Sequence, residues 1–208
     1  VKPINYLVDQ KKISSDILNN YINFNFNWNN NSVFLNIFSL KPGNYLKFDL
    51  NKKKLSINQF WKYEEKYHFF KKNNQYSKKN FDNLLKNEIE KELISDVPVG
   101  TFMSSGLDST LVTSIASTFK KDMQVYSIGY EDKNFDESEQ AYKISNYLDI
   151  KFNKILFKFS DVPNLFEELT DRLDLPHTDQ SDLPLYLLCK NAKKNGSKVI
   201  LTGDGGDE

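Results

Sequence analysis

The segment Ser-Ser-Gly-Leu-Asp-Ser at residues 104–109 combines hydroxyls, a glycine and a carboxylate between an apolar run and an amphipathic run. A strand-loop-helix segment of this kind offers backbone N–H groups, hydroxyls and the positive end of a helix dipole to an anion. The loop lacks the Gly-Lys-Ser/Thr ending that serves γ-phosphoryl transfer, so it suits a leaving pyrophosphate better. Taken alone, it is equally explained as a strand-to-helix turn capped by a serine.

A second candidate loop, Gly-Asp-Gly-Gly-Asp-Glu at residues 203–208, follows the apolar run 199–201. Its small residues let the backbone approach a ligand closely, while its carboxylates gather at one strand end. Carboxylate oxygens are ligands that Mg²⁺ prefers, so Asp108 and Asp207 together are candidates to hold Mg²⁺ against phosphate oxygens.

Alternating apolar and amphipathic runs surround both loops. Strands are predicted at 99–103, 124–130, 152–159 and 198–201, and helices at 77–93, 109–119, 136–148, in a stretch ending at 173, and at 183–194. This alternation predicts an α/β fold with a doubly wound parallel sheet. Because ligands bind at the carboxyl ends of such strands, both candidate loops are expected at the binding edge.

The N-terminal part follows a different pattern. It reads as loop over the first 32 residues, apart from a short helix at 15–21, and then shows alternating runs at 44–50 and 54–60. Those two runs predict a β-hairpin. The charged segment 64–79 has the composition of a solvated linker.

Composition narrows the class of protein. The 28 lysines and arginines balance the 28 aspartates and glutamates, so no strong positive field favours nucleic acid as a partner. No apolar run approaches the roughly 20 residues of a membrane span, so no membrane partner is expected. The single cysteine, Cys189, excludes an internal disulfide and fits a reducing, cytoplasmic compartment. Its apolar helical neighbours, Leu185 and Leu188, predict that it is a core residue.

Residues 104–109 resemble the Ser-Gly-Gly-x-Asp-Ser loop (PP-loop) of ATP pyrophosphatases, and residues 203–208 match the Gly-Asp-Gly-Gly-Asp-Glu segment of glutamine-dependent asparagine synthetases. Further stretches are similar to that family at 40–46, 96–100, 126–130, 135–138 and 179–184. The resemblance implies an adenine nucleotide α-hydrolase-like fold. It also implies that residues 1–65 are the C-terminal remnant of an N-terminal-nucleophile glutaminase domain plus a linker, and that residues 66–208 are the N-terminal part of the ATP-binding domain.

The implied activity is amide-bond formation by a ligase of amino-acid biosynthesis that uses ATP and Mg²⁺. Aspartate is adenylated, pyrophosphate leaves, and ammonia displaces AMP. The ammonia comes from glutamine through a glutaminase domain whose N-terminal cysteine this chain lacks. A C-terminal lysine that would steady the transition state is also missing, so the chain by itself is expected to be inactive. Its partners are then these small molecules and the missing regions, and a homodimer is left open.

The resemblance also assigns roles to particular residues. Pyrophosphate and ATP contacts fall on Ser104, Ser105, Gly106, Asp108 and Ser109, and the adenine borders on Ile128 and Gly203. The Mg²⁺ ligands would be Asp108 and Asp207, and Asp204 would be the catalytic residue that faces the acyl-adenylate and ammonia.

One departure from the family pattern concerns Ser105, where a glycine is expected. If this position has a positive φ, a serine costs about 1 kcal/mol and its side chain crowds the phosphates. Asp136 and Glu139, by contrast, have the spacing of a helix capping box and receive no catalytic role.

Two alternatives stay open at this point. The first is a related PP-loop amidotransferase with another acceptor, similar to surface-sugar amidotransferases or β-lactam synthetase. The second is a non-catalytic fragment or decayed paralogue, which Ser105 and the absent regions favour.

Overall fold

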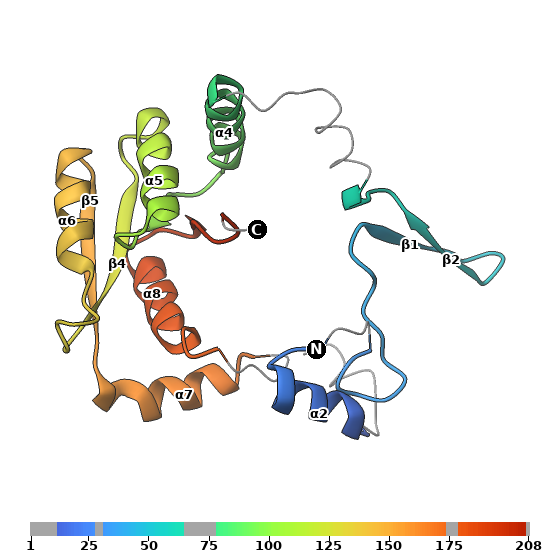
Figure 1. Cartoon of the computed structure of the whole chain (residues 1–208). Helices are drawn as coiled ribbons and strands as arrows, with labels where there is room; N and C mark the ends of the chain where they lie inside the picture. The colour runs from blue at the N-terminus through green and yellow to red at the C-terminus, as the bar shows by residue number, and fades with distance from the viewer. Residues whose placement is uncertain (1–11, 28–30, 65–77, 174–178, 207–208) are drawn as a thin grey trace. The chain divides into compact units, whose positions relative to one another are not determined.

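The computed structural model describes residues 12–27, 31–64, 78–173 and 179–206 of the 208-residue chain (Figure 1). The chain divides into two compact units. One, here called the hairpin unit, comprises Val1–Tyr76 and Arg172–Asp179, and the other, the sheet unit, comprises Ser77–Asp171 and Gln180–Glu208. The assignment of residues 1–65 to a glutaminase domain stays a prediction.

The sheet unit is built on four parallel strands in the order β5-β4-β3-β6. The strands are β3 (Val99–Phe102), β4 (Gln124–Tyr130), β5 (Lys151–Phe157) and β6 (Val199–Leu201). All four lie within or close to the predicted runs, so the expected parallel α/β sheet is confirmed.

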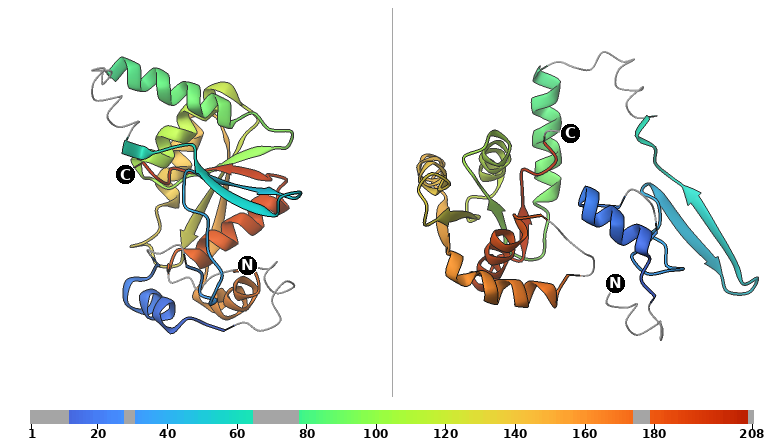
Figure 2. Two further views of the ribbon diagram at one scale, coloured as in Figure 1. Left: turned by 90° about the vertical axis from the view of Figure 1, so that its right-hand side faces the viewer. Right: turned by 60° about the horizontal axis from the view of Figure 1, so that its bottom comes forward.

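Helices cover both faces of this sheet, which confirms double winding (Figure 2). The helices are α4 (Lys78–Glu92), α5 (Leu107–Phe119), α6 (Ser138–Tyr147), α7 (Val162–Thr170) and α8 (Asp182–Lys194), with a 3₁₀ turn, η1 (Phe159–Asp161), before α7. The core with α4, α5 and α6 contains Ile89, Val99, Ala116, Val125 and Ala141. A separate core with α8 contains Tyr126, Ile155, Leu188 and Ala192. Successive side chains of β6 point to opposite faces of the sheet, so Val199 and Leu201 pack against the first core and Ile200 packs against the second.

Helix α5 begins at Leu107, two residues before the predicted start. Gly106 is the N-cap with extended backbone (φ −65°, ψ 153°), and its carbonyl accepts the Thr110 N–H at 3.2 Å. Asp108 therefore lies in the first turn of the helix rather than in the preceding loop. A carboxylate at this end is favourable because it meets the positive end of the helix dipole.

The prediction that Cys189 is a core residue is wrong, because its side chain is exposed. Helix α8 buries Pro184, Leu188 and Ala192, which recur every fourth residue, and Cys189 follows this stripe by one position. A rotation of about 100° per residue is enough to bring it to the outer surface.

The hairpin unit contains α2 (Ser15–Phe24) and the strands β1 (Asn44–Asp49) and β2 (Lys54–Gln59). The strands pair antiparallel from Asn44↔Gln59 to Asp49↔Lys54, so the predicted hairpin is confirmed. At its turn, the Asp49 carboxylate accepts the N–H groups of Asn51 and Lys52 at 3.0 and 2.9 Å. Across the described parts of both units, no helix has the length and apolar character that a membrane span requires.

Candidate functional site

The order of the strands creates a switch point between β3 and β6. After β3 the chain adds β4 and then β5 on one side, and it later returns to place β6 on the other side of β3. Loops that leave two such neighbouring strands diverge from each other, which opens a crevice at their carboxyl ends. The loops that leave β3 and β6 are the two candidate loops, residues 104–109 and 203–208.

These two loops lie in close contact. A Cβ atom added at Gly203 would lie 2.5 Å from the backbone N of Ser109 and 2.8 Å from its Cα. A Cβ atom added at Gly206 would lie 2.6 Å from Oδ2 of Asp108. Glycine is required at Gly203 because its neighbour is backbone that cannot rotate away. The structure thus brings together two segments that lie about 100 residues apart in the sequence.

A cavity of about 690 Å³ opens where the loops meet, and we call it the strand-end cavity. Seven of the predicted site residues line it: Ser104, Gly106, Asp108, Ser109, Ile128, Gly203 and Asp204. Ser105 is not among the lining residues, and Asp207 lies outside the described residues. The roles assigned to these residues stay predictions, but their gathering around one cavity is observed.

The loop after β3 is held by its own hydroxyls. The N–H of Ser104 donates to Oγ of Ser109 at 3.2 Å, and the N–H of Gly106 donates to Oγ of Ser104 at 3.0 Å. The two hydroxyls lie 3.0 Å apart. Ser109 and Ser104 thus fix the loop and also present polar atoms to the cavity, as a site for an oxyanion requires.

Ser105 differs from the sequence-based expectation. It is not among the described residues with positive φ, so the condition under which a serine would strain the backbone here is not met. Its hydroxyl donates to Oε2 of Glu137 at 2.7 Å, and its N–H donates to the same oxygen at 3.2 Å. The side chain is therefore accommodated by a specific partner from a distant segment.

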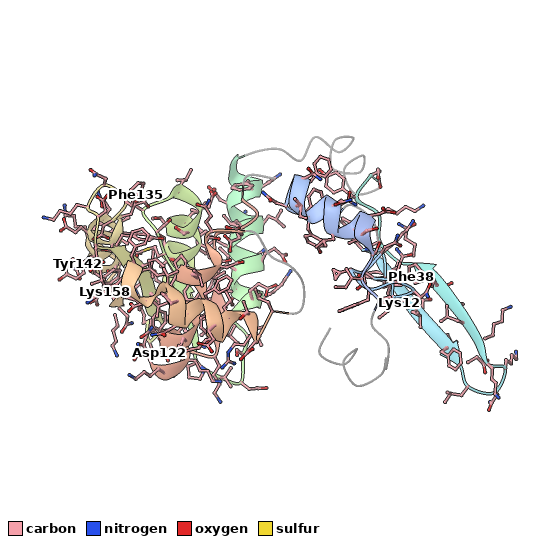
Figure 3. The ribbon with its side chains drawn as sticks, turned by 90° about the horizontal axis from the view of Figure 1, so that it is seen from below. Lys12, Phe38, Asp122, Phe135, Tyr142 and Lys158 are labelled. Atoms are coloured by element: carbon pink, nitrogen blue, oxygen red, sulfur yellow. The ribbon has the colours of Figure 1, made fainter. Side chains whose placement is uncertain are left out.

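Glu137 is a residue of this site that the sequence analysis missed. It lines the cavity together with Tyr130 and Phe135, and all three belong to β4 or the segment that joins β4 to α6 (Phe135 is labelled in Figure 3). Burial raises the pKa of Tyr130, and the negative charge of Glu137 raises it further. The only sequence signal at Glu137 was the family resemblance of the stretch 135–138, because its contact with Ser105 joins two segments far apart in the chain.

Asp136, next to Glu137, anchors this segment. Its carboxylate accepts the N–H and hydroxyl of Ser138 at 3.0 and 2.5 Å, and it pairs with Lys154 Nζ on β5 at 2.9 Å. Burial acts to raise the pKa of Asp136, but the hydrogen bonds from Ser138 and Lys154 and the charge of Lys154 outweigh it and lower the pKa to about 2. Gly129 leaves the space for this ion pair, since a Cβ there would lie 2.4 Å from Cε of Lys154.

The carboxylate oxygens around the cavity are suitable ligands for Mg²⁺. Asp108 and Asp204 supply carboxylates, and Mg²⁺ is typically bound by one or two protein carboxylates together with substrate phosphates and water. Within the described ranges, no cluster of three or more His, Cys, Asp or Glu side chains forms a complete metal cage. A shared protein and substrate coordination shell is the arrangement that this donor set allows.

Comparison with known proteins supports the family resemblance of the loops at residues 104–109 and 203–208. The asparagine synthase family model matches residues 80–208. A putative asparagine synthetase [glutamine-hydrolyzing] 2 of Methanocaldococcus jannaschii is 31% identical over 100% of this chain and 39% of its own length. Asparagine synthetase [glutamine-hydrolyzing] 1 of Bacillus subtilis is 34% identical over 55% of this chain and 18% of its own length. The chain thus spans about two-fifths or less of these relatives.

Solved structures with partial similarity include two synthetases. An NH3-dependent NAD synthetase of Campylobacter jejuni aligns over 55% of this chain and 52% of its own at 16% identity, with a TM-score of 0.39. An NMN synthetase of Francisella tularensis aligns over 59% of this chain and 52% of its own at 16% identity, with a TM-score of 0.43. The family assignment rests on sequence instead: since the family model covers most of the chain and includes both loops of the strand-end cavity, the chain belongs to the asparagine synthase family.

Proposed function

We propose that this chain is the ATP-binding part of a glutamine-dependent asparagine synthetase, an ATP-dependent carbon–nitrogen ligase. The observation that carries the proposal is the contact between the two loops at the switch point, where Gly203 lies against Ser109 and Gly206 against Asp108. Residues with hydroxyls, Ser104 and Ser109, and residues with carboxylates, Asp108 and Asp204, then line a single cavity. Family membership adds support, because the matched region includes both loops.

In the proposed reaction, a side-chain carboxylate oxygen of aspartate attacks the α-phosphorus of ATP. The bond between the α-phosphorus and the bridging oxygen breaks, and pyrophosphate leaves. Ammonia then attacks the acyl carbon, AMP departs with the former carboxylate oxygen, and asparagine remains. Charge develops on the departing pyrophosphate, so preorganised donors at the loop with Ser104 and Ser109 would lower this barrier.

The proposed roles follow the positions around the cavity. Ser104, Gly106 and Ser109 would hold pyrophosphate, while Ile128 and Gly203 would border the adenine. Asp204 would face the acyl-adenylate. Mg²⁺ would be bound by Asp108, with Asp207 as the second proposed ligand, and would neutralise charge on the phosphate oxygens when bound.

Ammonia would be supplied by glutamine hydrolysis in a glutaminase domain, and the reaction would take place in the cytoplasm. Both statements extend beyond this chain, which spans 39% of the relative that it matches along its whole length. They are part of the proposal and are tested with the full-length protein.

The test is exchange of labelled pyrophosphate into ATP by the full-length protein, because adenylation is reversible. Exchange should require both Mg²⁺ and aspartate, and Asp108→Asn should abolish most of it while leaving the fold intact. Product analysis in the presence of ammonia should give AMP. Formation of ADP, or exchange that ignores aspartate, would overturn the proposed reaction or the proposed acceptor respectively.

A further inference from the structure

The donors of Ser105 are occupied by a carboxylate from another segment. Oε2 of Glu137 accepts the Ser105 hydroxyl at 2.7 Å and the Ser105 N–H at 3.2 Å. An oxygen that bridges an amide and a hydroxyl of this loop occupies the kind of position that a phosphate oxygen would take.

The neighbouring amides of the loop are occupied in a different way. Those of Ser104 and Gly106 donate to the hydroxyls of Ser109 and Ser104. A hydroxyl that accepts one hydrogen bond can still donate another. Although the hydroxyls of Ser104 and Ser109 lie 3.0 Å apart and share one hydrogen bond, their hydrogens can rotate towards a phosphate oxygen without a movement of either side chain. An ionised carboxylate only accepts, and it carries the same sign of charge as a phosphate. Glu137 therefore cannot share the Ser105 donors with a phosphate.

Glu137 connects the loop with the cavity, because it accepts hydrogen bonds from Ser105 and also lines the cavity. Glu137 lines the strand-end cavity, whereas its partner Ser105 does not. Glu137 is an exposed residue just before α6, so its side chain can turn into water without losing a buried contact. The other charged side chains that line the cavity in the described part of the chain are Asp108 and Asp204, and no lysine or arginine is among them.

We infer that Glu137 is an intramolecular anion that holds the donors of Ser105 while the site is empty and is displaced when the pyrophosphate end of a nucleotide binds. This inference rests on the proposed function. Because a bound phosphate must first displace the Glu137 carboxylate, this competition lowers the affinity of the loop for phosphates. Removal of the carboxylate should therefore strengthen pyrophosphate binding.

The test is calorimetric titration of the chain with inorganic pyrophosphate and with ATP, each in the presence of Mg²⁺. Glu137→Gln keeps the shape but removes the charge, and it should tighten pyrophosphate binding by roughly three- to tenfold, as expected when a charge-assisted hydrogen bond no longer competes. Glu137→Ala should tighten binding at least as much. Ser105→Ala, which removes the 2.7 Å bond but keeps the N–H, should give a smaller gain in the same direction.

The matched control is Glu131→Gln, which removes an equal charge from an exposed residue of the same β4–α6 segment that does not line the cavity. It should leave pyrophosphate affinity unchanged, because only local competition at Ser105 is proposed. Equal tightening in Glu131→Gln and Glu137→Gln would overturn the inference in favour of a general charge effect. Thermal unfolding of each variant verifies folding, and Ser105→Ala serves as the test if either Glu137 variant fails to fold.

The remaining outcomes separate this inference from the proposed function. If the unmodified chain binds Mg²⁺-pyrophosphate and Glu137→Gln binds it equally or more weakly, Glu137 either stabilises the loop or contacts the ligand. In that case the inference fails while the proposed function stands. If neither the unmodified chain nor any variant binds ATP or pyrophosphate, the proposed function fails and the inference fails with it.

Discussion

At the scale of single residues, the site depends on how closely two backbones approach each other. Gly203 and Gly206 both lack the space for a side chain, but for different reasons. Gly203 faces the backbone of Ser109, whereas Gly206 faces the carboxylate of Asp108. Backbone held in a helix cannot yield, while a carboxylate can rotate. Substitution of Gly203 therefore tests the stability of the contact between the loops, whereas substitution of Gly206 tests the position of Asp108, the proposed metal ligand.

Gly203→Ala should lower the free energy of unfolding by about 1–3 kcal/mol, because the methyl group overlaps with main-chain atoms and pushes the two loops apart. It should also weaken Mg²⁺-ATP binding. Gly206→Ala is the paired comparison: it should cost little stability but still weaken Mg²⁺-dependent binding, since it displaces the Asp108 carboxylate. Urea unfolding and calorimetry of both variants test this, and normal stability of Gly203→Ala would contradict the close contact.

At the scale of elements, a salt bridge and a buried hydrogen bond connect strands to neighbouring segments, and we call each of them a polar joint. The Asp136–Lys154 pair connects the segment before α6 to β5. The hydroxyls of Tyr126 and Ser197, both buried, lie 2.8 Å apart and connect β4 to the turn that precedes β6. Since β4 and β6 flank β3 on opposite sides, the Tyr126–Ser197 hydrogen bond spans the strand that precedes the loop at residues 104–109.

The Asp136 joint predicts a particular pH dependence. Because the pKa of Asp136 is lowered to about 2 in the folded protein, its contribution to stability is present above its ordinary pKa near 4 and is lost as the pH falls towards 2. Asp136→Asn should therefore be less stable than the unmodified chain at pH 7, by about 1–2 kcal/mol once solvent screening of Lys154 is considered, and most of this difference should be lost at pH 2, where about half of the folded Asp136 is protonated.

Urea unfolding of both proteins at pH 7, 4 and 2 measures this difference. Asp122→Asn is the control, because Asp122 is an exposed carboxylate of the same unit (Figure 3). A deficit in Asp136→Asn that stays constant down to pH 2 would show that the loss is steric and not due to charge.

The Tyr126–Ser197 joint predicts strong coupling between two residues distant in sequence. Ser197→Ala leaves the buried Tyr126 hydroxyl without this partner and should lower the free energy of unfolding by about 1–3 kcal/mol. Tyr126→Phe should likewise leave the Ser197 hydroxyl without this partner. The double variant removes both polar groups and should be less destabilised than the sum of the single variants. Additive losses in such a double-mutant cycle would contradict the hydrogen bond.

At the scale of the whole molecule, the two units differ in how much apolar surface they bury. The sheet unit has fully buried residues in its central strands, such as Val125 and Tyr126 at 0% exposure. In the hairpin unit, one face of the hairpin carries Leu46, Phe48, Leu55 and Ile57 with exposed fractions of 49%, 50%, 51% and 57%. A two-stranded hairpin with an apolar face of this kind gains little from burial and is marginally stable by itself.

Amide hydrogen exchange of the 208-residue chain should reflect this difference. Amides of β4, which is paired on both sides, should exchange at least about 100-fold more slowly than those of β1 and β2, because local opening of the hairpin exposes little additional apolar surface. Mass spectrometry of the exchanged peptides measures both regions in one sample. Equal protection in the two regions would mean that the hairpin is stabilised by packing that its exposed face does not reveal.

The sequence by itself determined the local features of this protein. Strand and helix periods follow from the pattern of neighbouring side chains, so the parallel sheet and the hairpin were predictable, and so were the two loops at 104–109 and 203–208. Helix boundaries were less predictable, because α5 starts at Leu107 with Gly106 as its N-cap, two residues before the predicted start.

Only the tertiary structure decided which segments meet. Strand order is set by packing between elements far apart in the chain, and periodicity carries no information about it. The pairing of β6 with β3 brings Gly203 to Ser109 and places both loops around one cavity. The same reason explains Ser105, whose φ and whose bond to Glu137, 32 positions away, were invisible in the local pattern. A residue that departs from a local motif is accommodated by a partner that the fold supplies, and for Ser105 that partner is a carboxylate on the neighbouring strand's loop.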